Sequence, residues 1–496
     1  ANTEMRGGDA YASPRLSDAY SDILKSTSWN QYNHNFNATL LQETAFNSNS
    51  AGAFECWSSH YDRIRRENEF LRDAAEFGRK FGEDWLKIRI AEVRFCRAYA
   101  YFMLCRVYGG GILRTEVDGP EQNDKARSTE EECWGFIINE LKELAPDLPL
   151  KWDSDNSGRA TQKAAYGLLS RVALYAEKWD VAAQAARDCA TAEGNLDLSK
   201  NGYAKIFELG INSPEVLFAV EFKSSVIDHA YDAYVRPSGD TKELGKQVYS
   251  GFVPTSELVD SYEMAGDGGN FSWEKHGKDP YANREPRFYA TILYNGADWM
   301  GRKIESFVGG KDGYKAYENA GAAGTTVTGY YLRKYLIDGD KTWVTSGSGQ
   351  DWIVLRYAEV LLNKAEALAM ENWNKNSAEA LQALNDVRAR VGLPARATAD
   401  KETFLEYVRH ERKVELAGEG FRYWDLRRWR LAEKVIDGQN VHGVKISKQS
   451  DGSFTYEQVD ADGGHKRIFY DRYYRFAIPL SERSNNSLCT NNDGWI

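Results

Sequence analysis

Charged residues lie on the inward-facing side of two predicted helices, in the stretch from residue 409 to residue 432. Apolar residues recur at helical spacing on one face of each helix, and Gly418 and Gly420 separate the two. Charges that leave water must be paired and hydrogen-bonded, and arginine has a planar fork that fits a carboxylate. We therefore predict a partly buried ion network that locks a helical hairpin, made by five residues: Arg412, Glu415, Glu419, Asp425 and Arg428.

A carboxylate pair for acid–base catalysis is the alternative interpretation of this stretch. The neighbouring arginines would hold such carboxylates ionised at neutral pH. Permanently ionised carboxylates suit a structural lock better than a proton donor, so we prefer the structural interpretation.

Two segments that are far apart in the sequence resemble each other. Residues 168–180 and 361–374 share paired leucines, a cation, an alanine, and a tryptophan followed by Asp or Asn. Each precedes an alanine-rich helical segment, at 181–192 and 377–391. A helix, a short polar turn and a small-residue helix are typical of a TPR-type unit, and such units stack because one alone cannot bury its apolar face. This pattern predicts a mostly α fold with a TPR-like helical scaffold over about residues 51–193 and 352–433.

Between these parts, about residues 195–350, the sequence is rich in Gly, Asn, Asp and Lys and has no sustained period. Long ordered loops in a compact protein usually carry function. We therefore predict a large loop-rich, ligand-binding region. A few short β-hairpins are also expected, including a C-terminal hairpin and tail over 441–496, with strands at 453–459 and 467–476 joined across 460–464. Calcium at Asp460 and Asp462 is the alternative, but the downstream glutamate of a calcium loop is missing, so we predict no metal.

Five stretches carry a resemblance to a known family when they are taken in order. They cover residues 91–110, 158–180, 355–369, 411–429 and 476–496. Together they resemble the SusD/RagB family, the surface glycan-binding lipoproteins of nutrient-uptake systems in Bacteroidetes. The resemblance implies a single SusD-like domain over 21–496, capture of an oligosaccharide or polysaccharide, and a SusC-like TonB-dependent outer-membrane transporter as partner. A peptide ligand, as in the RagB branch, is the alternative within binding.

The family also implies a place at the cell surface, held to the outer membrane by a lipidated cysteine. Residues 1–20 lack the basic and apolar parts of a secretory signal, and no apolar run approaches the roughly 20 residues that span a bilayer. The first cysteine is Cys56. We therefore expect a mature chain trimmed past its lipid anchor, with a flexible tether over 1–20.

Composition and motifs argue against several function classes. The net charge of −10 and the pI near 5.5 disfavour nucleic acid as a partner. The six cysteines show no metal or disulfide spacing, and the usual catalytic and nucleotide-binding motifs are missing, so we predict neither a cofactor nor a catalytic residue.

Two further alternatives remain. A helical glycoside hydrolase would need two carboxylates about 5–9.5 Å apart, for which Asp279, Glu285 and Asp298 are candidates. A TPR adaptor that binds protein segments would need repeats in tandem, whereas these are separated in the sequence.

Aromatic residues in the polar loops are the candidate ligand contacts. A sugar offers a face of C–H groups that stacks on an exposed ring, and hydroxyls that bind polar side chains. Trp273 and Trp299 lie among such polar side chains. The predicted ligand-binding residues are Trp273, Trp299, Tyr281, Asn283, Arg284, Trp343, Tyr314 and Trp29, with Tyr32 and Tyr317 as further loop aromatics.

Overall fold

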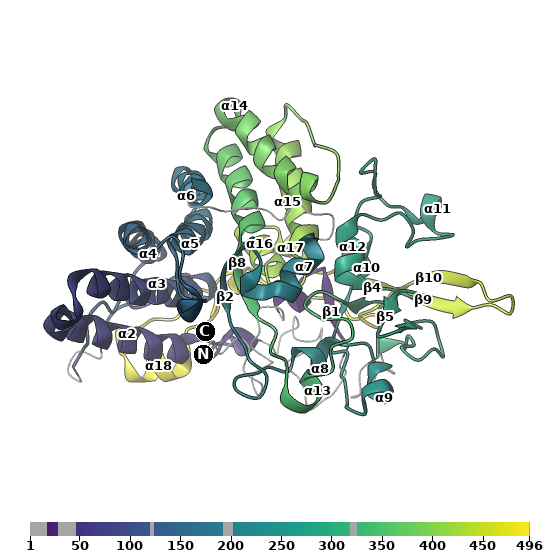
Figure 1. Ribbon diagram of the computed structural model, residues 1–496, viewed down its shortest axis with the longest axis horizontal. Helices are drawn as coiled ribbons and strands as arrows, with labels where there is room; N and C mark the ends of the chain where they lie inside the picture. The colour runs from purple at the N-terminus through teal and green to yellow at the C-terminus, as the bar shows by residue number, and fades with distance from the viewer. Residues whose placement is uncertain (1–16, 28–45, 120–123, 192–201, 318–324, 496) are drawn as a thin grey trace.

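Helices are the main regular secondary structure in the computed structural model, which describes residues 17–27, 46–119, 124–191, 202–317 and 325–495 (Figure 1). The prediction of a mostly α fold with a TPR-like scaffold is therefore confirmed. The scaffold helices are α2 (Trp57–Phe77), α3 (Glu83–Tyr108), α4 (Glu130–Leu144), α5 (Gln162–Tyr175), α6 (Trp179–Thr191), α14 (Tyr357–Arg390), α15 (Lys401–Glu415) and α16 (Arg422–Arg428).

Shorter helices lie in the loop-rich region and near the C-terminus. They are α7 (Gly202–Leu209), α8 (Tyr231–Val235), α9 (Asp240–Leu244), α10 (Ser256–Val259), α11 (Trp273–His276), α12 (Pro286–Thr291), α13 (Trp343–Ser346), α17 (Ala432–Ile436) and α18 (Leu480–Asn485).

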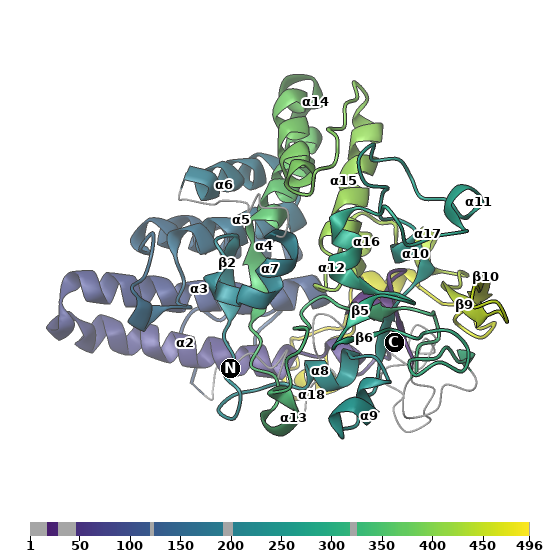
Figure 2. The same cartoon turned by 45° about the vertical axis from the view of Figure 1, so that its right-hand side comes forward.

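The scaffold helices stack in one continuous series. Helices α2 to α6 pack each on the next, and α14 then packs against α5 and α6 (Figures 1 and 2). Helix α14 is kinked at Asn372, whose φ of −165° and ψ of 93° make the predicted polar turn. The two repeat segments therefore meet in space, although the loop-rich region separates them in the sequence. The distance between the two repeat segments in the sequence therefore does not exclude a shared helical surface.

Local sequence signals explain where the scaffold helices begin and end. Thr129 and Glu132 form a capping box at the start of α4, in which each side chain accepts the other's backbone N–H. Thr161 caps α5 and Asp400 caps α15, and each of these side chains accepts one backbone N–H of its helix. Gly109 ends α3 in the left-handed region at φ +70°, and a Cβ there would clash with Arg475.

In the described part of the chain, the strands form five separate antiparallel pairs. The C-terminal hairpin joins its two strands across residues 449–453, so the predicted pairing across 460–464 is wrong. In that second turn, Asp462 pairs with Lys25 and Arg467 in the interior, which ties residues 460–467 to the body of the protein. The pairs are β1 (Leu24–Ser26) with β3 (Phe252–Pro254), β2 (Val216–Val220) with β8 (Trp352–Arg356), β4 (Ile292–Leu293) with β7 (Tyr331–Leu332), β5 (Asp298–Trp299) with β6 (Arg302–Lys303), and β9 (His442–Lys448) with β10 (Phe454–Asp460).

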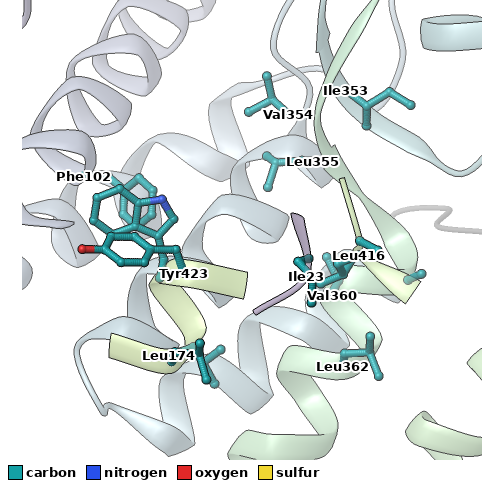
Figure 3. Close-up of a cluster of buried hydrophobic side chains, with 14 of the residues drawn as sticks. Ile23, Phe102, Leu174, Ile353, Val354, Leu355, Val360, Leu362, Leu416 and Tyr423 are labelled. Atoms are coloured by element: carbon teal, nitrogen blue, oxygen red, sulfur yellow. The ribbon is translucent and has the colours of Figure 1, made fainter. Parts of the chain in front are cut away.

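The hydrophobic core continues from the first part of the scaffold into the second. Figure 3 shows Phe102 and Leu174 from the first part in the same cluster as Val360 and Leu416 from the second. Ile23, in the N-terminal segment, belongs to this core as well.

The N-terminal segment is docked from residue 17 onward. Asp18 is fully buried and accepts N–H bonds from Gly418, Gly420 and Arg422 at 3.0–3.1 Å. Residues 17–20 therefore belong to the folded body and not to the predicted tether, whose residues 1–16 lie outside the described part of the chain.

Four of the five predicted lock residues are buried and Arg428 is partly buried, but the five fall into two groups. In the first, Asp425 bridges Arg412 and Arg428, each at 2.8 Å, and Arg428 also pairs with Glu366 of α14. This group links α14, α15 and α16.

The second group is centred on Glu415 and Glu419. Glu415 pairs with Arg287, Arg356 and Arg390, and Glu419 pairs with Arg356 and Lys334. Partners from β8 and α12 were not foreseen, because they come from segments that the helical pattern does not relate to this hairpin. The group therefore ties the loop-rich region to the scaffold.

The described residue ranges contain neither a membrane-spanning helix nor a metal-binding cluster. None of the helices described is both long and apolar enough to cross a bilayer. Within those ranges, no three or more His, Cys, Asp or Glu side chains gather closely enough to hold a metal ion.

Candidate functional site

The predicted loop residues do not gather at one place. Trp273 begins α11 and Trp343 begins α13, and Figures 1 and 2 show these two helices on different sides of the molecule. Trp273 is half-buried, and its Nε1 donates to Asp260 at 2.9 Å. Trp29 and Tyr32 lie outside the described residues.

Four of the predicted ligand contacts are buried: Trp299, Tyr281, Arg284 and Trp343. Trp299 has no exposed surface, and its Nε1 donates to Asp240 at 3.0 Å. Tyr281 is packed among other aromatic rings, including those of Phe288 and Tyr294. Arg284 donates to the backbone carbonyls of residues 259, 262 and 280 and lies over the Phe271 ring. These side chains hold the loops in place, so the expectation that they are exposed to a ligand is wrong for them.

The other predicted loop residues, Asn283, Tyr314 and Tyr317, differ in how far they are exposed. Asn283 is exposed and has a φ of +53°, so its role in the loop is a tight turn. Tyr314 is half-buried, and Tyr317 is buried beneath the ammonium of Lys25. None of these three lines the cleft described below.

Replacing Trp299 with phenylalanine tests the anchoring role. Only a benzene ring is kept at this buried position, and Asp240 loses one donor, so the free energy of unfolding is expected to fall by about 1–3 kcal/mol from the lost hydrogen bond, with a further loss from packing. Ligand affinity is expected to stay unchanged. Urea denaturation of the variant checks this, with Trp273→Phe as the matched control, since Trp273 also donates to an aspartate but is half-buried. An equal effect of both substitutions would contradict the assignment of Trp299 as the stronger anchor.

A cleft of about 700 Å³ opens where Trp343 lies, within the range typical of small-molecule sites. It is formed by α8, α13, the turn at 225–230 and the segment 246–249. In Figures 1 and 2, α8 and α13 lie together at the lower edge of the molecule. The cleft is the strongest candidate for the functional site because it combines an exposed aromatic ring with polar side chains.

A pair of stacked tyrosines forms one wall of the cleft. The rings of Tyr234 and Tyr249 are 5.1 Å apart between centroids, at an interplanar angle of 25°. Backbone hydrogen bonds fix this arrangement, from the Tyr249 N–H to the Ala233 carbonyl at 2.7 Å and from the Gly251 N–H to the Tyr234 carbonyl at 2.6 Å. Tyr249 is 39% exposed, so part of its ring faces solvent, whereas Tyr234 is half-buried.

Trp343 supports the cleft from inside. The guanidinium carbon of Arg236 lies 5.2 Å from the ring centroids of both Trp343 and Trp299, and Arg236 itself is fully buried. Such cation–π contacts are stronger in a desolvated setting. The Trp343 Nε1 has no hydrogen-bond partner among the described residues. Trp343 is therefore a lining residue that is only 1% exposed, and not the open stacking platform that was predicted.

Two loops meet at the rim of the cleft. His229 and Ser348 exchange two backbone hydrogen bonds, at 3.1 and 2.9 Å, and the Ser225 N–H donates to the Ser346 carbonyl. Gly347, at φ +73°, is required here because a Cβ would lie 2.4 Å from the Asp228 side chain. This close approach holds Asp228 against the rim.

Polar side chains complete the lining. The Lys246 ammonium donates to the carbonyl of Val344 at 2.6 Å, which ties the segment 246–249 to α13. The side chains able to bind hydroxyl groups are Ser225, Asp228, Lys246, Gln247, Thr345 and Ser346. Both hydrogen-bond donors and hydrogen-bond acceptors therefore lie beside the aromatic wall.

The candidate catalytic carboxylates lie elsewhere. Glu285 is fully buried and pairs with Arg287 at 2.6 Å, and the exposed side chain of Asp298 pairs with Lys303 across β5 and β6. The three candidate carboxylates, Asp279, Glu285 and Asp298, do not line the cleft.

Neither Tyr234 nor Tyr249 is among the residues predicted from the sequence. Their segments, 229–235 and 247–251, are short and have no helical or strand period. The available signal was two tyrosines in the first segment and one in the second, each beside polar residues, which does not show that the two segments come together.

Comparisons with known proteins agree over most of the chain. A family model described as "SusD family" matches residues 214–495, and another described as "Starch-binding associating with outer membrane" matches residues 4–174. A SusD-like protein of Bacteroides ovatus is 26% identical over 452 residues, which cover 85% of this chain and 74% of the relative.

Solved structures show the same fold. A SusD-like protein from Bacteroides fragilis gives a TM-score of 0.83 at 26% identity, with 97% of this chain and 93% of that chain covered. Surface glycan-binding protein A from Bacteroides thetaiotaomicron, solved in complex with laminarihexaose, gives a TM-score of 0.68 at 19% identity, with 97% and 93% covered.

Proposed function

Because this chain belongs to the SusD family, we propose that it binds an oligosaccharide or polysaccharide, without cleaving it, in the cleft between α8 and α13. The Bacteroides thetaiotaomicron neighbour, whose structure contains laminarihexaose, supports a glycan as the class of ligand.

The tyrosine pair, in which Tyr249 is exposed and Tyr234 half-buried, is the observation that carries the proposal. A pyranose ring presents C–H groups that pack on an aromatic face, and the stacked rings of Tyr234 and Tyr249 provide such a face. Hydroxyl groups at the edge of the sugar would then reach the polar side chains of the rim, such as Asp228 and Gln247. An apolar face beside polar groups fits a sugar better than it fits a purely apolar ligand.

The composition of the cleft supports binding without hydrolysis. Asp228 is the one carboxylate among the described residues that line it. Glycoside hydrolysis commonly requires a pair of carboxylates on opposite sides of the scissile bond. The cleft as described therefore favours a binding protein over a hydrolase.

We extend the proposal to the cellular role. The description of the model that matches residues 4–174 supports a place at the outer membrane, and the family resemblance supports delivery of the glycan to a SusC-like TonB-dependent transporter. Isolation of the protein from its native envelope tests this role by the recovery of a large β-barrel partner. Isolation without such a companion would remove the transport role and leave glycan binding in place.

A panel of polysaccharides in affinity gels tests the main proposal, with a reducing-sugar assay on the same panel. Retarded migration on at least one polysaccharide, with no release of reducing ends, is the expected result. Turnover would favour the hydrolase, whereas binding only to peptides would favour the peptide-binding alternative. Retardation by no polysaccharide would contradict the proposal.

A further inference from the structure

A second cavity, of about 380 Å³, lies where the two parts of the scaffold meet. Helices α3, α4 and α5 line it from one side, and α14, α15 and α16 from the other. It shares no lining residue with the cleft between α8 and α13. Whatever binds here would contact both parts of the scaffold at once.

Arginine dominates the lining of this cavity. Six arginines but only three glutamates line it. Arg428 pairs with Glu366, and Arg475 pairs with Glu130. Arg106 and Arg427 have no carboxylate partner among the described residues, so the cavity carries an excess of positive charge.

Donors without acceptors occur on the same side chains. Arg427 is 5% exposed, and its Nη2 donates to the Tyr474 carbonyl at 2.7 Å, but its Nε and Nη1 have no partner among the described residues. The same holds for the Nε of Arg106 and the Nε1 of Trp424. A buried donor that lacks an acceptor is costly, and native structures contain few of them. All of these groups are donors, which points to a missing acceptor.

Ring contacts account for only part of the stabilisation of these cations. The guanidinium carbons of Arg106 and Arg427 lie 4.4 and 4.7 Å from the centroid of the Trp424 ring, and Arg427 also lies 4.5 Å from that of Phe476. Such contacts are favourable, but they do not replace an anion. Burial lowers the pKa of Arg427 to about 10, and repulsion from Arg475 and Arg106 acts in the same direction. The group therefore remains charged at neutral pH.

We propose that this cavity binds an oxyanion, such as a sulfate, phosphate or carboxylate group, with Arg427 and Arg106 as its principal cationic partners. The planar fork of arginine matches the paired oxygens of these groups and forms strong, charge-assisted hydrogen bonds with them. A water molecule occupies about 30 Å³ of liquid, so the cavity is larger than a bare ion needs. The oxyanion can therefore arrive as a free ion or as a substituent of a small sugar.

Thermal unfolding with added anions tests this site. The whole chain is melted in increasing sodium sulfate, and separately in sodium phosphate, against sodium chloride at equal ionic strength. A ligand that binds only the folded state raises the melting temperature in a saturable way. Glucose 6-sulfate compared with glucose distinguishes a sugar substituent from a free ion as the source of the group.

Variants then locate the effect. Arg427→Met and Arg106→Met are each expected to weaken oxyanion binding about tenfold or more, as the loss of a charged hydrogen-bond partner predicts. Arg106 is only half-buried, so its variant remains informative if Arg427→Met fails to fold. Arg187→Met is the matched control, since Arg187 pairs with Glu379 outside the cavity and its variant should bind as the parent does.

Each outcome of these measurements either supports or overturns the oxyanion site. A saturable, oxyanion-specific rise in the parent that is weakened in the two cavity variants supports the site, whether the free ion or only the sulfated sugar produces it. No saturable rise in the parent with any of these anions overturns the proposal, as does a rise that both cavity variants retain. Failure here would leave glycan binding in the other cleft untouched, because that is measured separately in affinity gels.

Discussion

Replacing Glu415 with alanine is expected to lower the free energy of unfolding by about 3–5 kcal/mol, the cost of removing one partner from a buried ion pair. Glu415 is fully buried and shared by Arg287, Arg356 and Arg390. Its loss would leave these cations without a common acceptor in the interior. Urea denaturation followed by circular dichroism measures the change.

Glu406 provides the matched control on the same helix. It pairs with Arg409, but its side chain is exposed, so Glu406→Ala is expected to cost less than about 1 kcal/mol. Similar losses for Glu415→Ala and Glu406→Ala would show that the buried group contributes no more than a surface pair.

The same carboxylate should make stability sensitive to acid. Burial acts to raise the pKa of Glu415, but Arg390, Arg356 and Arg287 outweigh it and hold that pKa well below its usual range. A group of this kind contributes stability above its unfolded-state pKa of about 4.3 and loses it as the pH falls through the folded-state value. The stabilities of the parent and of Glu415→Gln should therefore converge as the pH is lowered below about 4.

Replacing Tyr249 with alanine is expected to weaken glycan binding about ten- to hundred-fold. Removal of the ring deletes apolar contact worth about 1.5–3 kcal/mol if a sugar stacks on it. Stability should change little because the ring is 39% exposed. Isothermal titration calorimetry with a glycan identified in the affinity gels measures the affinity.

Two further variants define the origin of this effect. Tyr249→Phe keeps the ring and should retain most of the affinity, whereas Tyr314→Ala removes a half-buried loop tyrosine outside the cleft and should bind as the parent does. Binding by stacking and neutral hydroxyls should also change little with salt, since no screened charge pair carries it. Parent-like binding by Tyr249→Ala would place the site elsewhere on the surface.

The helical part of the fold could be predicted because it follows a period. Apolar spacing placed Arg412 and Glu415 on the inner face of α15, and both are buried. The repeated leucines and tryptophans located the turn at Asn372. The partners of Glu415 could not be predicted in this way, because Arg287 comes from a distant loop-rich segment and no local pattern relates the two.

The candidate site could be predicted only in part for the same reason. Trp343 was singled out and lines the cleft. Trp299 has equally polar neighbours in the sequence, but it is fully buried. Composition shows that a loop contains an aromatic ring, whereas the tertiary contacts decide whether that ring faces water. Tyr234 and Tyr249 meet through backbone hydrogen bonds between two loops, which no spacing rule reveals.

The insertion of the loop-rich region between two stacked parts of the scaffold sets an order of events during synthesis. Helix α6 ends at Thr191, but α14, which covers it, begins only at Tyr357. At 5–20 residues per second, the ribosome needs roughly ten to thirty seconds to make the intervening chain. Throughout that interval, the apolar face of the nascent α5–α6 pair lacks its final neighbour. Exposed apolar surface of this kind promotes aggregation, so the newly made chain is expected to depend on a holding chaperone until α14 emerges.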